Sequence, residues 1–113
     1  PNEGKSSLLC HDTERVVKIV KAIQPIFKEI PVLIKLSYFT SDEKLKDFIE
    51  KVSPYVAGFN AINTIAGDVR NPDGTQALPG KGRLISGVCG APIKWAGIDM
   101  VKRMVKLREE REA

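Results

Sequence analysis

The chain has 113 residues, of which 42% are hydrophobic and 28% are charged. This balance excludes a disordered tail, and it excludes a membrane protein because no apolar run approaches the ~20 residues of a spanning helix. The net charge of +4 allows an anionic ligand but lacks the dense basic patch typical of nucleic-acid binding. We therefore expect a soluble, cytoplasmic protein of one domain, without a nucleic-acid or membrane partner.

The cysteines and the histidine predict neither a metal site nor a disulfide scaffold. Cys10 and Cys89 are far apart without CxxC spacing, and His11 alone cannot complete a set of zinc ligands. Neither thiol has an evident general base, so we interpret both as structural. The chain begins with Pro1 rather than Met and shows no secretory signal, so we expect it to be a piece of a longer protein.

The first predicted elements are a helix and a strand. After a possible cap at Asp12, apolar residues recur at helical spacing through residues 16–30, and Pro25 predicts that the helix kinks or ends near Gln24. Residues 31–36 then form a short, nearly continuous apolar run rich in β-branched side chains. Such a run is typical of a buried parallel strand.

A second helix and strand follow in the same order. Thr40 and Glu43 have capping-box spacing, an apolar stripe occupies residues 45–52, and Pro54 ends the helix. Residues 56–63 are again short and mostly apolar, which predicts a second buried strand. Alternation of helices and strands with short connections indicates βαβ units around a parallel sheet.

The remainder of the chain is a glycine-rich segment and a last helix. Residues 67–90 contain six of the nine glycines and a turn at residues 72–74, and they lack a clear period, so we expect a long functional loop. After Pro92 an amphipathic helix carries Ile93, Ile98, Val101, Met104 and Val105, and it ends in a solvated charged run over residues 106–112.

The predicted elements form only part of an α/β architecture. Two parallel strands and three helices cannot close a barrel or cover both faces of a sheet. The simplest interpretation is that residues 1–113 are a contiguous slice of an α/β barrel rather than a complete one. The remaining strands must then come from the rest of the polypeptide or from another copy of the chain.

Candidate functional residues lie where the predicted strands end, because ligands of parallel α/β folds bind at the carboxyl ends of the strands. Lys35 is a charged residue in an apolar strand, so it has either a functional role or a side chain that extends to the sheet edge. Asn63 and Thr64 suit a polar heterocycle, although both also cap turns. Gly87 and Gly90 could bring backbone N–H groups to an anion or a flavin.

Four sequence blocks in this order resemble the dihydroorotate dehydrogenase family. They are Pro1-Asn2 with Gly4-Lys5, residues 31–36, residues 60–65 and residues 86–94, and the resemblance extends to about Met104. Members of this family are FMN-dependent (β/α)8 TIM barrels, and they include the pyrimidine-reducing domain of dihydropyrimidine dehydrogenase. The resemblance implies that this chain is a slice from the middle of such a barrel.

The same resemblance implies roles for individual residues. Lys35 looks like the strand lysine that stabilises negative charge on the reduced flavin. The other implied cofactor-binding residues are Gly87 and Gly90, and the implied substrate-binding residues are Asn2, Asn63 and Thr64. The family's catalytic base and phosphate site fall outside this chain, so no catalytic residue is assigned.

The implied activity is oxidation of dihydroorotate to orotate in pyrimidine biosynthesis, with hydride passing to flavin N5. Two alternatives remain open. Leu9-Cys10 and the run Asp73-Gly74-Thr75 are similar to the branch that reduces pyrimidines. Since Ser37, Ser86, Cys89 and Trp95 depart from the family pattern, and the base and phosphate site are missing, the chain could instead be a non-catalytic interaction module or degenerate half-barrel.

Overall fold

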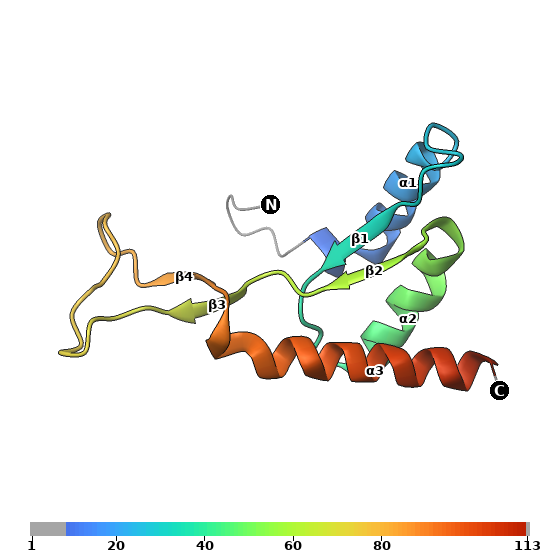
Figure 1. Ribbon diagram of the computed structural model, residues 1–113. Helices are drawn as coiled ribbons and strands as arrows, with labels where there is room; N and C mark the ends of the chain where they lie inside the picture. The colour runs from blue at the N-terminus through green and yellow to red at the C-terminus, as the bar shows by residue number, and fades with distance from the viewer. Residues whose placement is uncertain (1–8, 113) are drawn as a thin grey trace.

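The computed structural model describes residues 9–112 as a mixed α/β arrangement (Figure 1). Three short 3-10 turns accompany the regular elements, at Leu9–His11, Ser53–Tyr55 and Ala91–Ile93. The regular elements are α1 (Thr13–Ile23), β1 (Leu33–Leu36), α2 (Asp42–Val52), β2 (Gly58–Ala61), β3 (Ile65–Asp68), β4 (Ile85–Val88) and α3 (Lys94–Glu112). No helix within residues 9–112 is both long and apolar enough to cross a bilayer.

Helix α1 confirms the predicted start and end. Its cap is Asp12, whose carboxylate accepts a hydrogen bond from the Arg15 backbone N–H, and the helix ends at Ile23 just before Pro25. The apolar spacing continues beyond this point, but its side chains are not buried: Ile26 and Ile30 are 74% and 63% exposed. The turns that follow Pro25 carry further apolar side chains, but no element within residues 9–112 packs against them.

Helix α2 begins one residue later than the capping box predicted. Ser41, not Thr40, is the cap, and its hydroxyl accepts a hydrogen bond from the Lys44 backbone N–H. The predicted end is confirmed, because the helix stops at Val52 and Pro54 lies in the following 3-10 turn. The side chains of Leu45, Phe48 and Val52 are fully buried in the core.

The strands β1 and β2 form a parallel pair, as predicted, in a register that places Lys35 opposite Asn60. Within residues 9–112 this sheet has two strands and does not close a barrel. Ile34, Leu36 and Phe59 point toward the helices and pack in the core. The expectation of a strand buried on both faces is wrong, because Leu33 is 63% exposed and no described element covers that side of the sheet.

The glycine-rich segment contains a β-ribbon, contrary to the prediction of an irregular loop. Residues 65–68 of β3 pair antiparallel with residues 85–88 of β4, and the ribbon projects away from the helices (Figure 1). The predicted turn at its far end is confirmed: the Gly74 N–H donates to the Asn71 carbonyl over 2.8 Å. Gly74 has a φ of 88°, a left-handed conformation that glycine adopts without strain.

Helix α3 runs along α2 and β2 (Figure 1). It begins after Pro92 as predicted, and its charged run is solvent-exposed apart from Leu107. The predicted apolar face is wrong in part. Met104 packs against the core, and Ala96 and Met100 are fully buried, but Ile98 and Val101 are 46% and 48% exposed.

Candidate functional site

The carboxyl ends of the two parallel strands bring three predicted residues to one end of the sheet. Lys35 precedes the last residue of β1. Asn63 follows β2, and its backbone N–H donates to the Leu36 carbonyl of β1 over 3.0 Å. Thr64 is next in the chain. The parallel pairing thus places Lys35, Asn63 and Thr64 at the same end, as the order of elements predicted.

A local hydrogen bond joins Asn63 and Thr64, in addition to any contact with a ligand. The Asn63 side-chain oxygen Oδ1 accepts a hydrogen bond from the Thr64 backbone N–H over 2.9 Å. This bond occupies the oxygen but leaves the amide nitrogen Nδ2, which carries two N–H donors. Both residues are exposed. The structural role and the predicted binding role therefore use different atoms of the same side chain.

Gly87 lies directly against Thr64. A Cβ atom added at Gly87 would stand 2.5 Å from Thr64 Oγ1 and 3.0 Å from Thr64 Cβ, closer than real side chains approach. Only a glycine allows β4 to pass the strand end at this distance. The requirement for glycine here therefore has a packing explanation, and the contact brings the ribbon to the site.

Gly90 has a different reason to be glycine. Its φ of 75° lies in the left-handed region, and an added Cβ would meet no atom within 4 Å. The residue immediately precedes the 3-10 turn that leads into α3. The backbone conformation selects glycine here, and the space beside it is open.

Lys35 is not buried, contrary to the expectation that it sits in a buried strand. Its side chain is exposed on the uncovered face of the sheet together with Asn60. No carboxylate among residues 9–112 forms an ion pair with it. The ammonium group is therefore available to a ligand. Because the side chain is exposed to solvent, its charge does not require a partner.

The remaining sequence candidates contribute little to this site. Asn2 lies outside the described residues. Cys10 is buried in the core, where its sulfur accepts a 3.5 Å hydrogen bond from the Ser37 backbone N–H, and Cys89 is an exposed free thiol. Residues 9–112 contain no group of three or more side chains able to hold a metal ion.

A polar network beside the site was not predicted from the sequence. Tyr38 donates to Asp99 Oδ2 over 2.9 Å, and Arg103 contacts the same oxygen over 3.3 Å. Arg103 also donates to the Phe39 carbonyl over 2.6 Å and to Asp42 over 2.7 Å. These bonds fasten α3 to the segment that follows Lys35. The spacing of Asp99 and Arg103 on one helix face was the only signal in the sequence.

The network also shifts two pKa values. The hydrogen bond to Asp99 is the main reason that the pKa of Tyr38 is raised, and burial and the Asp99 charge add to it. Burial alone would lower the pKa of Arg103, but its bonds to Asp42 and Asp99 outweigh this effect and raise the pKa. Both side chains therefore keep their protons near neutral pH and serve as donors.

These features define an α/β protein segment with a polar surface at the ends of two parallel strands. The chain is 36% identical over 75 residues to dihydroorotate dehydrogenase from Dictyostelium discoideum, a match that covers 66% of this chain and 20% of that protein. It therefore corresponds to about one fifth of the length of this curated relative. No protein-family model and no solved structure matches the chain.

Proposed function

We propose that the chain is a segment of an FMN-dependent oxidoreductase that oxidises dihydroorotate to orotate in pyrimidine biosynthesis. The proposal rests mainly on the likeness to dihydroorotate dehydrogenase over two thirds of the chain. The convergence of Lys35, Asn63, Thr64 and Gly87 at one end of the sheet supports it. The activity belongs to the whole protein, in which a catalytic base and a phosphate site come from outside this chain.

The residues present fit one edge of a flavin and a pyrimidine. Carbonyl oxygens and nitrogens on such rings need hydrogen-bond donors, which the exposed Lys35 ammonium and the Asn63 amide supply. The open space beside Gly90 allows a ring to approach the backbone. Bound FMN would supply hydride acceptance from the dihydropyrimidine. Lys35 and Gly90 would hold the cofactor with Gly87, while Asn63 and Thr64 would hold the substrate.

Lys35 and Asn63 have different roles in this proposal. The Lys35 ammonium stabilises negative charge that develops during reduction, so Lys35→Ala should slow flavin reduction and lower its potential with little change in pyrimidine affinity. Asn63→Ala leaves substrate groups unpaired and should weaken binding by about 1–3 kcal/mol. Both variants are made in the full-length protein and compared by stopped-flow flavin reduction and pyrimidine titration.

Two further variants separate these roles from structural effects. Asn63→Asp retains an oxygen for the Thr64 N–H but loses the amide donor, so it should weaken substrate binding as Asn63→Ala does. Lys102→Ala removes a lysine from the exposed side of α3 and should change neither reaction. An unchanged reduction rate and potential in Lys35→Ala would show that Lys35 has no part in the chemistry.

The test also distinguishes the alternative functions. A flavin spectrum in the purified full-length protein, with reduction by dihydroorotate, supports the proposal. Reduction by dihydrouracil in its place would assign the chain to the pyrimidine-reducing branch. Absence of bound flavin would favour a non-catalytic interaction module.

We further propose that strands outside this chain complete the sheet, either from the rest of the polypeptide or from another copy. Among residues 9–112, each of β1 and β2 pairs along one edge only, and no element covers the face that carries Leu33 and Lys35. Unpaired edges and exposed apolar sheet favour association. Residues 1–113 alone should therefore self-associate in sedimentation velocity. A monomer that melts cooperatively would contradict this proposal.

A further inference from the structure

The segment by which the chain leaves β1 is held from two sides. This strand-exit segment consists of Ser37, Tyr38 and Phe39, and it leads to the cap of α2. On one side the Ser37 backbone N–H donates to the sulfur of the buried Cys10 over 3.5 Å. On the other side Tyr38 and Phe39 both bond to α3. Because Ser37 and Phe39 are only 3% exposed, the segment cannot move without disturbing the core.

Arg103 is the residue of α3 that holds the backbone of the strand-exit segment. Its Nη1 donates to the Phe39 carbonyl over 2.6 Å and to Asp99 Oδ2 over 3.3 Å. The same Asp99 oxygen accepts the Tyr38 hydroxyl, and the guanidinium carbon of Arg103 lies 5.5 Å from the centre of the Tyr38 ring. The Arg103 side chain is only 17% exposed, so solvent weakens these charge-assisted bonds little. One side chain thus fixes the segment through both its backbone and its ring.

The strand-exit segment in turn fixes the position of Asn63. Leu36, which directly precedes the segment, is fully buried, and its carbonyl accepts the Asn63 backbone N–H over 3.0 Å. The Asn63 side-chain oxygen accepts the Thr64 N–H, so the direction of the amide group follows that of the backbone. Because peptide units are rigid and planar, a displacement of the segment also moves the Leu36 carbonyl. The placement of the Asn63 amide donors therefore depends on Arg103.

Lys35 does not depend on the same contacts. It lies within the regular register of β1 and β2, opposite Asn60, so the pairing of the two strands sets its position. At the amino end of this pair, the Ala57 N–H donates to the Val32 carbonyl over 2.8 Å. This bond stands at the other end of the strands from the strand-exit segment. Loss of the Arg103 guanidinium should therefore disturb Asn63 while Lys35 and the amino end of the pair stay in place.

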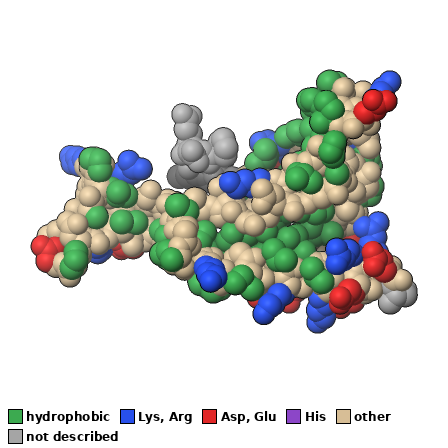
Figure 2. Space-filling model, in the orientation of Figure 1, with side chains coloured by type: hydrophobic (Ala, Val, Ile, Leu, Met, Phe, Trp, Pro, Cys, Tyr) green, Lys and Arg blue, Asp and Glu red, His purple; other side chains and the backbone are tan. Residues whose placement is uncertain are grey.

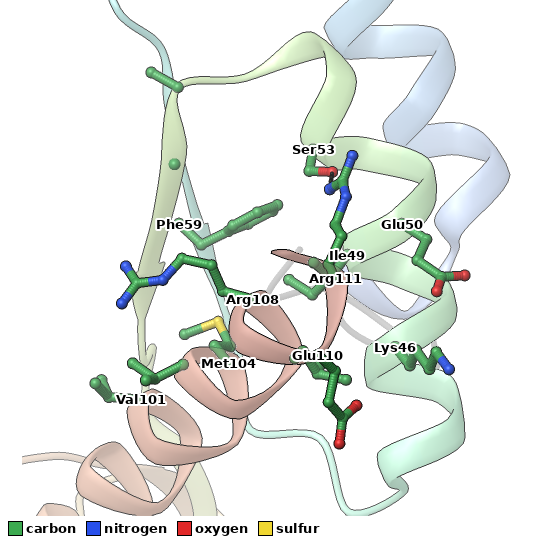
Figure 3. Close-up of a pocket in the computed structure, with 14 residues that line it drawn as sticks. Lys46, Ile49, Glu50, Ser53, Phe59, Val101, Met104, Arg108, Glu110 and Arg111 are labelled. Atoms are coloured by element: carbon green, nitrogen blue, oxygen red, sulfur yellow. Dashed lines mark hydrogen bonds between the residues drawn. The ribbon is translucent and has the colours of Figure 1, made fainter. Parts of the chain in front are cut away.

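Arg111 offers a matched comparison on the same helix. It stands about two turns further along α3 than Arg103, or about 12 Å at the rise of an α-helix. Its guanidinium donates to Ser53 Oγ over 2.8 Å, and Figure 3 shows the side chain reaching Ser53. Ser53 directly follows α2, so this bond lies at the end of α2 that leads to β2. Both arginines fasten α3 to its neighbours, but they do so at opposite ends of α2.

We infer that Arg103 is a positioning residue of the strand-end site. It sets the direction in which Asn63 presents its amide donors to the substrate, and it does so through the strand-exit segment without touching the substrate itself. The inference rests on the proposed function, which assigns Asn63 to the pyrimidine and Lys35 to the flavin. Its consequence is a split between the two: loss of Arg103 weakens pyrimidine binding and leaves the flavin potential unchanged.

The split is measured by titrating the full-length flavoprotein with orotate, followed by flavin absorbance, and by determining the flavin potential. Arg103→Met should raise the orotate Kd about three- to tenfold with no change in potential. In an Asn63→Ala background the same substitution should have no further effect on the Kd, because the donors it positions are gone. Arg111→Met should leave the Kd unchanged. An equal loss of affinity from Arg103→Met in both backgrounds, or an equal loss from Arg111→Met, would overturn the inference.

Hydrogen exchange of single amides separates this inference from the proposed function. In the full-length protein, Arg103→Met should speed exchange of the Asn63 amide, which donates to Leu36, at least about threefold. The Ala57 amide should exchange at its original rate, and Arg111→Met should affect neither amide. A wild type that binds no orotate but shows this pattern would refute the proposed function and support the control of Asn63 by Arg103. Equal acceleration of both amides in Arg103→Met, or none, would overturn that control.

Discussion

Arg103 offers the sharpest test of how this chain holds its last helix in place. Arg103→Met retains most of the apolar stem but removes the guanidinium, which joins α3 to Phe39 and Asp42 and also contacts Asp99 on α3 itself. The charge-assisted bond to the Phe39 carbonyl is worth about 1.5–3 kcal/mol. The pair with Asp42 adds only about 0–1 kcal/mol, because that carboxylate is 85% exposed.

One effect acts in the opposite direction. Arg103 Nη2 is buried and has no hydrogen-bond partner among residues 9–112, so its removal recovers about 1 kcal/mol. The net loss for Arg103→Met should therefore be about 0.5–3 kcal/mol in the free energy of unfolding. The stability of Arg103→Lys should lie between those of the wild type and Arg103→Met, because a lysine ammonium keeps the charge but cannot reproduce the forked geometry of the guanidinium.

Urea unfolding at fixed protein concentration measures this difference. The single tryptophan, Trp95, lies on α3 with its ring 5.4 Å from that of Tyr38, so its fluorescence reports whether the helix is docked. Asp42→Asn is the matched control and should cost less than about 1 kcal/mol, because it removes only the exposed pair. If Arg103→Met were no more destabilising than Asp42→Asn, the bond to the Phe39 carbonyl would not be what holds the helix.

Three further outcomes follow from local contacts. Gly87→Ala should weaken the β-ribbon by about 1–3 kcal/mol, and Thr64→Ala should restore part of the loss, measured as amide hydrogen exchange in β3 and β4. Burial and a nearby lysine charge lower the pKa of His11, so the unfolded chain takes up a proton first as pH falls. Stability should therefore decrease slightly below about pH 6.5, and His11→Gln should remove this dependence in urea titrations. Hydrogen bonds from Thr75 lower the pKa of Asp73, so Thr75→Ala should raise this pKa in an NMR titration. An unchanged pKa would show that the turn does not form in solution.

The first half of the fold was predictable because its signals are local. The cap at Asp12, the break at Pro25 and the stripe in α2 are set by neighbours in sequence. The β-ribbon was missed because its strands have four residues each, contain Gly67 and Gly87, and pair across a long connection. Such short strands leave no measurable period.

Neither the buried face of α3 nor the exposure of Lys35 could be predicted from the sequence, because both depend on contacts between distant parts of the fold. Ala96 and Met100 are buried because α3 docks through the Arg103 network, whose partners Tyr38 and Phe39 are more than 60 residues away. The position of Lys35 at the carboxyl end of the sheet could be predicted, because it depends only on the parallel connection of β1 and β2. Its burial depends on whether another layer covers the sheet, and residues 9–112 supply none.

The projecting β-ribbon should make the fold tolerant of insertions and deletions at its tip. The molecule measures 51 Å along its longest axis and 30 Å across, and the ribbon lies apart from the helical layer (Figure 2). None of the buried core side chains comes from β3 or β4. Residues inserted or deleted near the turn at Gly74 therefore alter the length of an arm without disturbing the core, since longer surface loops cost little entropy. Variation in the length of this segment could thus accumulate without loss of the parallel strand pair.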